Sequence, residues 1–177
     1  MQELRCAAAV SQDKEMLNTY YQERDNPKLI RPDTGEEFDN PYVDLHLVAC
    51  LSIPRFSYLN ECKPWELMNM AKTANEKGIV PRSVGKVQNF LTLYGGQASK
   101  LSEQSGLDIK EAEEVIKGYF KKFYGLARWL NKMGTLARYQ KWVTDPIGRK
   151  YFVGEDNAKG SSDENTSVRK GCNAVIS

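Results

Sequence analysis

Four side chains that could together bind a nucleotide recur at intervals of four residues: Arg82, Lys86, Phe90 and Tyr94. On a helix they would form one stripe, with successive members about 6 Å apart along the axis. Arginine forks onto phosphate oxygens and lysine acts as a point charge, while the two rings could lie beside a sugar and a base. The alternative is an ordinary amphipathic helix whose aromatic residues are core and whose cations extend into solvent.

The segment that carries this stripe has the signals of a complete helix. Pro81 fits a first helical turn and the pair Gly95-Gly96 fits a helix end, so the sequence predicts a helix over 81–94. A second, apolar stripe predicts its buried side, and its members are Val84, Val87 and Leu91.

The rest of the sequence predicts a mainly α protein with at most one short two-stranded ribbon. Asp108 and Glu111 have the spacing of a capping box at a helix start. Proline, glycine and acidic residues over 26–42 indicate an irregular loop or insertion, and alternating residues over 142–153 indicate a hairpin. The other expected helices cover 4–21 (two short ones), 65–76, 98–105, 108–123 and 125–138, with a last one beginning at 165.

Composition excludes several classes of protein. The 177 residues include no apolar run long enough to span a membrane and no signal-peptide pattern. The four cysteines lie far apart without a C-x-x-C pair and His46 is the only histidine, which argues against a zinc cluster, a disulfide framework and a histidine-based triad. We therefore expect reduced thiols in a cytoplasmic protein.

The net charge of +2 conceals an uneven distribution along the chain. Residues 77–150 contain 14 Lys and Arg against 6 Asp and Glu, a net charge of +8. Residues 1–76 contain 8 against 13, a net charge of −5. A basic central block favours a polyanionic partner such as nucleic acid or a nucleotide, although a solvated lysine-rich helix face would give the same count.

Six blocks of the sequence, in order, resemble motifs of the family A DNA polymerases. The stripe followed by Gly95 reads R-x3-K-x3-F-x3-Y-G and resembles motif B, the O helix of the fingers. The other five blocks are Gln2-Glu3-Leu4-Arg5 (the end of motif A), Asp44-Leu45-His46, the stretch EAEEVIKGYFKKFYGLARWL beginning at Glu111, Gly148-Arg149-Lys150-Tyr151, and Val168-Arg169-Lys170-Gly171-Cys172-Asn173.

The resemblance implies the mainly α fingers subdomain of a right-hand DNA polymerase, with a short β-hairpin and the palm only partly present. It divides the chain into four parts: 1–50, the end of motif A and adjoining palm and fingers helices with an insertion at 26–40; 51–79, an insertion and a helix leading to the fingers; 80–140, the fingers with the O helix at 81–94; and 141–177, a hairpin and the start of the helix that enters the palm.

The same resemblance implies a nucleotide-binding role for each member of the stripe. Arg82, Lys86 and His46 would grip the triphosphate of an incoming dNTP. Phe90 would stack beside its sugar, and Tyr94 would close over the nascent base pair. A rotation of the fingers would bring these groups onto the triphosphate when a correct pair forms.

The resemblance further implies contacts at both ends of the chain. Glu3 would be the steric gate that rejects a ribose 2′-hydroxyl. The residues expected to contact primer–template DNA are Gly95, Arg149, Arg169 and Asn173. The expected partners are therefore dNTPs, primer–template DNA and the remaining palm and thumb segments, with no membrane.

The resemblance implies Mg²⁺ in the complete enzyme, because phosphoryl transfer of this kind uses two Mg²⁺ ions held by carboxylates. In that family one aspartate lies five residues before the glutamate matched by Glu3, a position that precedes Met1, and the second lies in motif C, beyond the helix that contains Asn173. We therefore expect no metal ligand and no complete catalytic set in this chain, with Lys86 and Tyr94 in supporting roles.

Three interpretations of the sequence remain open. The chain is one piece of a family A DNA polymerase with a split gene, encoded by a phage or virus and working in the host cytoplasm; or an incomplete reading frame without a function of its own; or a stand-alone, non-catalytic helical module that binds nucleic acid.

Overall fold

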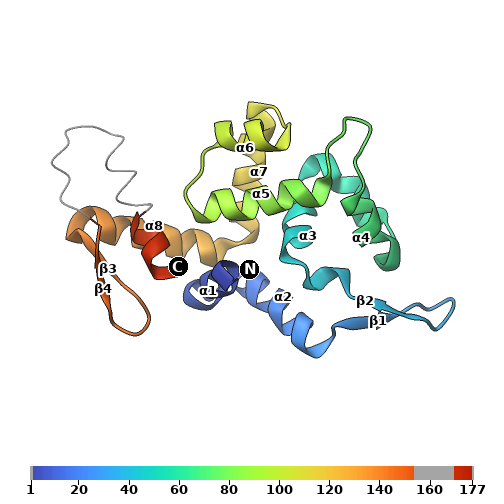
Figure 1. Ribbon diagram of the computed structural model, residues 1–177, viewed down its shortest axis with the longest axis horizontal. Helices are drawn as coiled ribbons and strands as arrows, with labels where there is room; N and C mark the ends of the chain where they lie inside the picture. The colour runs from blue at the N-terminus through green and yellow to red at the C-terminus, as the bar shows by residue number, and fades with distance from the viewer. Residues whose placement is uncertain (1, 154–169, 177) are drawn as a thin grey trace.

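The computed structural model describes residues 2–153 and 170–176, and this part of the chain is mainly helical (Figure 1), as expected. A helical stretch also covers 170–176. The other helices are α1 (Gln2–Ser11), α2 (Lys14–Asp25), α3 (Leu45–Cys50), α4 (Pro64–Lys72), α5 (Pro81–Leu93), α6 (Ala98–Ser105), α7 (Ile109–Lys122) and α8 (Tyr124–Gln140), with two 3₁₀ segments, η1 (Pro41–Val43) and η2 (Pro54–Glu61).

The expected helix bounds are confirmed most closely around the stripe. α5 ends at Leu93, one residue before the expected end, and α6 has the expected bounds. The capping box is confirmed: the Glu111 amide donates to Asp108 Oδ1 at 2.9 Å, and the Asp108 amide donates to Glu111 Oε2 at 3.1 Å. α4 ends four residues before the expected 76, because the Asn75 side chain accepts hydrogen bonds from the amides of Lys77 and Ile79 and so forms a turn.

The expectation of at most one ribbon is wrong, since the described residues form two antiparallel strand pairs. The expected hairpin over 142–153 is confirmed as β3 (Trp142–Thr144) paired with β4 (Lys150–Phe152). The segment expected to be irregular contains β1 (Lys28–Ile30) paired with β2 (Glu37–Asp39). Three-residue strands are too short to leave a periodic signal, and what holds this pair is distant in sequence: the Phe38 ring packs edge-on against Trp65 of α4, with centroids 6.1 Å apart.

Two hydrophobic clusters form the core, and α3 and α5 contribute to both. The first joins the two ends of the described chain, since Leu4 of α1 and Ile176 both belong to it, together with residues of α7 and α8. The second lies among α3, η2, α4, α5, α6 and α7. Val84 near the start of α5 is buried in the second cluster and Leu93 at its end in the first, so α5 links the two clusters (Figure 1).

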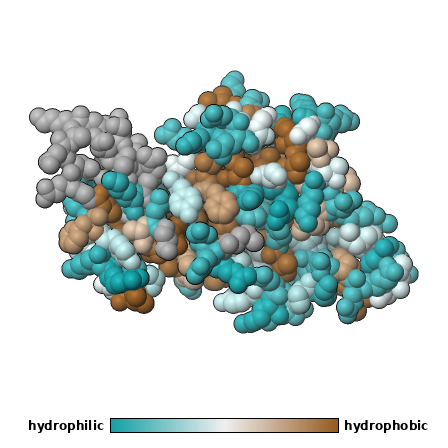
Figure 2. All heavy atoms as spheres, viewed as in Figure 1, coloured by the Kyte–Doolittle hydropathy of each residue, from teal (hydrophilic) through white to brown (hydrophobic). Residues whose placement is uncertain are grey.

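Polar residues cover most of the face shown in Figure 2. Apolar residues show along the line of α5 and at the β3–β4 hairpin (Figure 2), where Ile147 is 77% and Phe152 is 79% exposed. No helix of the described residues is long and apolar enough to cross a membrane.

Helices α3 and α5 cross at Gly85, where their backbones touch. A Cβ atom at Gly85 would collide with the carbonyl oxygen of His46 and would lie 2.9 Å from the amide nitrogen of Cys50. Glycine inside a helix costs about 0.5–1 kcal/mol relative to alanine, so its presence here reflects the close approach. This crossing fixes which residues of the two helices face each other.

A second close contact is made by Asp13, which is 1% exposed and caps two helices at once. Its Oδ1 accepts hydrogen bonds from the amides of Glu15 and Met16 at the start of α2, each 3.1 Å long. Its Oδ2 accepts a 3.0 Å bond from the amide of Leu126 at the start of α8. The neighbouring Gly125 allows this approach, because a Cβ there would lie 2.6 Å from the Cα of Asp13.

Replacing Gly85 by alanine should destabilise the fold although alanine is the better helix former. The added Cβ must push α3 away from α5, at a cost of about 1–3 kcal/mol in the free energy of unfolding, measured by chemical denaturation. Gly118 of α7 is the matched control, because a Cβ there meets only the carbonyl oxygen of Ser52, at 3.8 Å. Gly118→Ala should stabilise by about 0.5–1 kcal/mol. Equal effects of the two substitutions would show that the crossing is not tight.

Replacing Asp13 by alanine should cost at least about 2 kcal/mol, because it leaves three amides without their carboxylate acceptor. Asp108→Ala is the comparison: Asp108 is an exposed cap of a single helix, and its loss should cost about 1 kcal/mol. Both values come from urea denaturation. A loss at Asp13 no larger than the loss at Asp108 would argue against the double cap.

Candidate functional site

The predicted stripe lies on α5, with partial exposure of three of its members. Arg82, Phe90 and Tyr94 are half-buried and Lys86 is exposed. Tyr94 is the C-terminal cap residue of the helix, and its amide donates to the carbonyl oxygen of Phe90 at 3.0 Å. Neither ring is a fully buried core residue, so all four side chains reach the surface of this helix.

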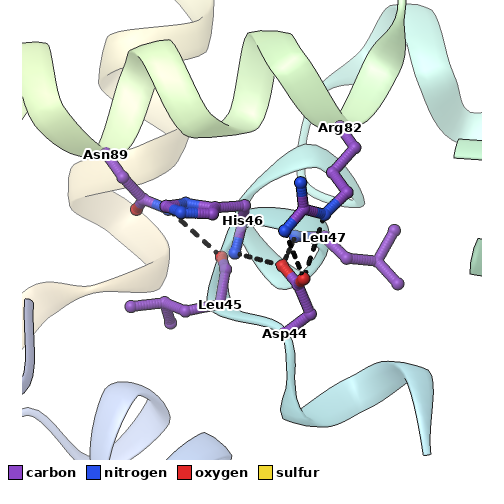
Figure 3. A network of polar contacts seen from close by, with 6 residues as sticks. All are labelled: Asp44, Leu45, His46, Leu47, Arg82 and Asn89. Atoms are coloured by element: carbon purple, nitrogen blue, oxygen red, sulfur yellow. Dashed lines mark hydrogen bonds and ion pairs between the residues drawn. The ribbon is translucent and has the colours of Figure 1, made fainter. Parts of the chain in front are cut away.

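Asp44 links the start of α3 to the start of α5 (Figure 3). Its Oδ1 caps α3 by accepting hydrogen bonds from the amides of His46 and Leu47, each 2.9 Å long. Its Oδ2 accepts from Arg82, from Nε at 2.9 Å and from Nη2 at 2.6 Å. The carboxylate therefore holds the Arg82 guanidinium across the helix crossing, with its other nitrogen–hydrogen donors left for a further anion.

His46 lies beside the stripe, brought there by α3. Its ring centroid is 5.9 Å from that of Phe90, and the residue is 2% exposed. Burial lowers the pKa of His46, with the charges of Arg82 and Lys86 adding to this effect and that of Asp44 opposing it. The imidazole is therefore neutral at pH 7.

Buried amides next to the stripe anchor α5 from behind. Asn89 Nδ2 donates to the carbonyl oxygen of Leu45 at 3.2 Å, and Tyr119 of α7 donates its hydroxyl to Asn89 Oδ1 at 2.8 Å. Gln88 Nε2 donates to the carbonyl oxygen of Val115 at 2.9 Å. Our sequence analysis missed both amides and assigned no role to Asp44. Two adjacent amides on the inner side of an apolar helix were the available signal, since buried polar groups need partners.

The structure also brings the predicted gate residue towards the end of the stripe. Glu3 lies half-buried on α1, and burial together with the charge of Glu3 raises the pKa of Tyr94. The site thus combines residues of α1, α3 and α5.

The predicted DNA contacts lie at separate places in the fold. Gly95 follows α5 with a φ of 70°, a left-handed conformation that favours glycine. Arg149 is on the β3–β4 hairpin, where its Nε donates to Asp145 Oδ2 at 2.8 Å. Asn173 is half-buried in the helical stretch 170–176, and Arg169 lies outside the described residues.

The described residues do not fit the Mg²⁺ ions implied by the resemblance. Between 2 and 153 and between 170 and 176, no group of three or more histidine, cysteine, aspartate or glutamate side chains could hold a metal ion. Asp44 and Asp145, two acids near the site residues, are already bound to Arg82 and Arg149.

Comparison with known proteins identifies relatives along the chain. The family model for DNA polymerase family A matches residues 66–177. DNA polymerase I of Helicobacter pylori is 26% identical over 174 residues, which cover 98% of this chain and 15% of that protein. The DNA polymerase of Mycobacterium phage D29 is 30% identical over 98 residues, or 54% of this chain and 16% of that polymerase. The chain thus spans only a small part of the length of these relatives.

A solved structure shares the fold. The polymerase domain of Pol1 from M. smegmatis, in complex with DNA primer–template and dNTP, superposes with a TM-score of 0.67 at 18% identity. The match covers 99% of this chain and 25% of that one, so the fold is that of part of a polymerase domain. Since the family model also matches more than half of the sequence, the chain belongs to DNA polymerase family A.

Proposed function

We propose that this chain is the nucleotide-selecting part of a template-directed DNA polymerase that acts in DNA replication. Arg82, Lys86 and His46 bind the triphosphate of the incoming dNTP, and Phe90 lies beside its sugar. The observation that carries the proposal is the crossing at Gly85, which sets His46 of α3 against Phe90 on the same stripe as both cations.

The order of groups along α5 matches the order of groups in a nucleotide. Arg82 and Lys86 lie at the end where the phosphates would bind, and the rings of Phe90 and Tyr94 lie towards the sugar and base. Asp44 already uses two donors of Arg82, so the guanidinium is oriented before any ligand arrives. Such preorganisation lowers the entropy that binding has to offset.

The end of α5 would face the template and the gate. Glu3 lies near enough to Tyr94 to influence its ionisation, which supports a role for both at the sugar and base of the nucleotide. Gly95, directly after the helix, has no side chain and would let a template strand approach the backbone. Arg149, Arg169 and Asn173 would contact the primer–template, mainly at its phosphates.

The described residues offer no carboxylate cluster for catalytic metal ions. We therefore assign the metal chemistry to palm residues outside this chain and derive no step of it here. The role of this chain is to hold the triphosphate and the base pair in place, with palm and thumb segments as its partners and the cytoplasm as its location.

Lys86→Ala should weaken dNTP binding in the polymerase that contains this chain, because it removes a charge-assisted contact of about 1–3 kcal/mol. The KM for dNTP in single-nucleotide primer extension should rise about 5- to 150-fold. Lys86 is a cleaner test than Arg82, whose loss would also leave Asp44 without its partner.

Lys72→Ala is the matched control, since Lys72 is an exposed lysine on α4 outside the stripe. It should leave the KM unchanged. Equal KM values for Lys86→Ala and the unsubstituted polymerase would contradict the assigned role. Tight primer–template binding by this chain together with no extension in any assembly would favour a non-catalytic nucleic-acid-binding module.

A further inference from the structure

The hydrogen bonds around His46 determine which of its ring nitrogens carries the proton. Asn89 Nδ2 lies 2.9 Å from His46 Nδ1 and 3.2 Å from the carbonyl oxygen of Leu45. A third contact, 2.8 Å long, joins Asn89 Oδ1 to the Tyr119 hydroxyl. All of these groups are buried except the partly exposed edges of the site, so each contact replaces water.

The carbonyl oxygen of Leu45 fixes the orientation of the Asn89 amide. A carbonyl oxygen can only accept, so the amide group nearest to it must be the NH₂ and not the oxygen. The amide oxygen then faces the Tyr119 hydroxyl, which can donate to it. The reverse orientation would place two oxygens against each other at Leu45, where neither could donate.

The remaining hydrogen of the Asn89 NH₂ is directed at His46 Nδ1. An NH₂ group has no acceptor lone pair, so Nδ1 must accept and must be unprotonated. In a neutral imidazole the proton is then on Nε2. Among the described residues Nε2 has no hydrogen-bond partner.

We propose that Asn89, itself fixed by Leu45 and Tyr119, is a positioning residue that holds His46 in the neutral tautomer with its proton on Nε2. His46 thereby offers a neutral N–H donor to a phosphate oxygen beside Arg82 and Lys86. The identity of that anion as a dNTP triphosphate depends on the proposed function, whereas the tautomer does not.

The charges around the ring favour the same state. Arg82 and Lys86 of α5 and Asp44 at the start of α3 act on His46, and burial is the largest influence lowering its pKa. Protonating Nδ1 would direct its hydrogen at the Asn89 NH₂, where both groups are donors. It would also add a third positive charge to the site, so the neutral donor is the form compatible with its neighbours.

The tautomer can be measured directly, because His46 is the only histidine of the sequence. Nitrogen NMR of this chain labelled with ¹⁵N-histidine yields one imidazole, whose two nitrogen shifts report the tautomer and whose pH titration reports the pKa. We expect protonated Nε2, unprotonated Nδ1 and a pKa below 6.5. Protonated Nδ1, or an even mixture of tautomers, would overturn the proposal without any substitution.

Two adjacent amides provide a matched pair of variants. Asn89→Ala should give a mixture of tautomers and a higher pKa, whereas Gln88→Ala removes an equally buried amide that contacts Val115 and should change neither. Asn89→Asp should reverse the tautomer, since a carboxylate accepts from Nδ1–H. Equal shifts in the Ala variants, or an unchanged tautomer in Asn89→Asp, would reduce Asn89 to a structural role.

Inorganic tripolyphosphate separates this proposal from the proposed function. Added to the labelled chain, it should shift the Nε2 resonance if Nε2–H donates to a phosphate oxygen. A protonated Nε2 that ignores tripolyphosphate would contradict phosphate binding at His46 and leave the tautomer assignment standing. A response to tripolyphosphate from a ring protonated on Nδ1 would contradict the role of Asn89 and leave phosphate binding standing.

Discussion

The contact between the backbones of α3 and α5 at Gly85 is the constraint on which the rest of the structure depends. Only glycine allows the two helices to approach this closely, since any Cβ would collide with the His46 carbonyl oxygen. Both helices contribute to both hydrophobic clusters, so their crossing also sets how the clusters sit against each other. A change in the crossing would therefore alter the core and the candidate site together.

The crossing explains why polar groups can be buried beside the site. Asp44 satisfies two amides of α3 and the guanidinium of Arg82, and Asn89 satisfies the Leu45 carbonyl, the His46 ring and the Tyr119 hydroxyl. Each of these residues has partners on more than one element. Networks of this kind specify one arrangement of helices, because a shift would leave buried donors and acceptors unpaired.

Local signals in the sequence predicted much of the fold. Pro81, the Gly95-Gly96 pair and the capping box at Asp108 act within one or two helical turns, so the corresponding helices were found with nearly correct bounds. The β1–β2 pair, the double cap by Asp13 and the Asn89–His46 contact join residues far apart in the chain, and spacing does not encode them. The stripe on α5 could be read from its spacing of four, whereas the amides that anchor it could not.

Membership of DNA polymerase family A and the shared polymerase-domain fold agree with a site built for a nucleotide. The most direct test is a structure of the polymerase that contains this chain, bound to primer–template and an incoming dNTP. We predict triphosphate oxygens at about 3 Å from Lys86 Nζ, an Arg82 nitrogen and His46 Nε2. A triphosphate bound away from α5, with Lys86 in solvent and Arg82 paired only with Asp44, would contradict the account.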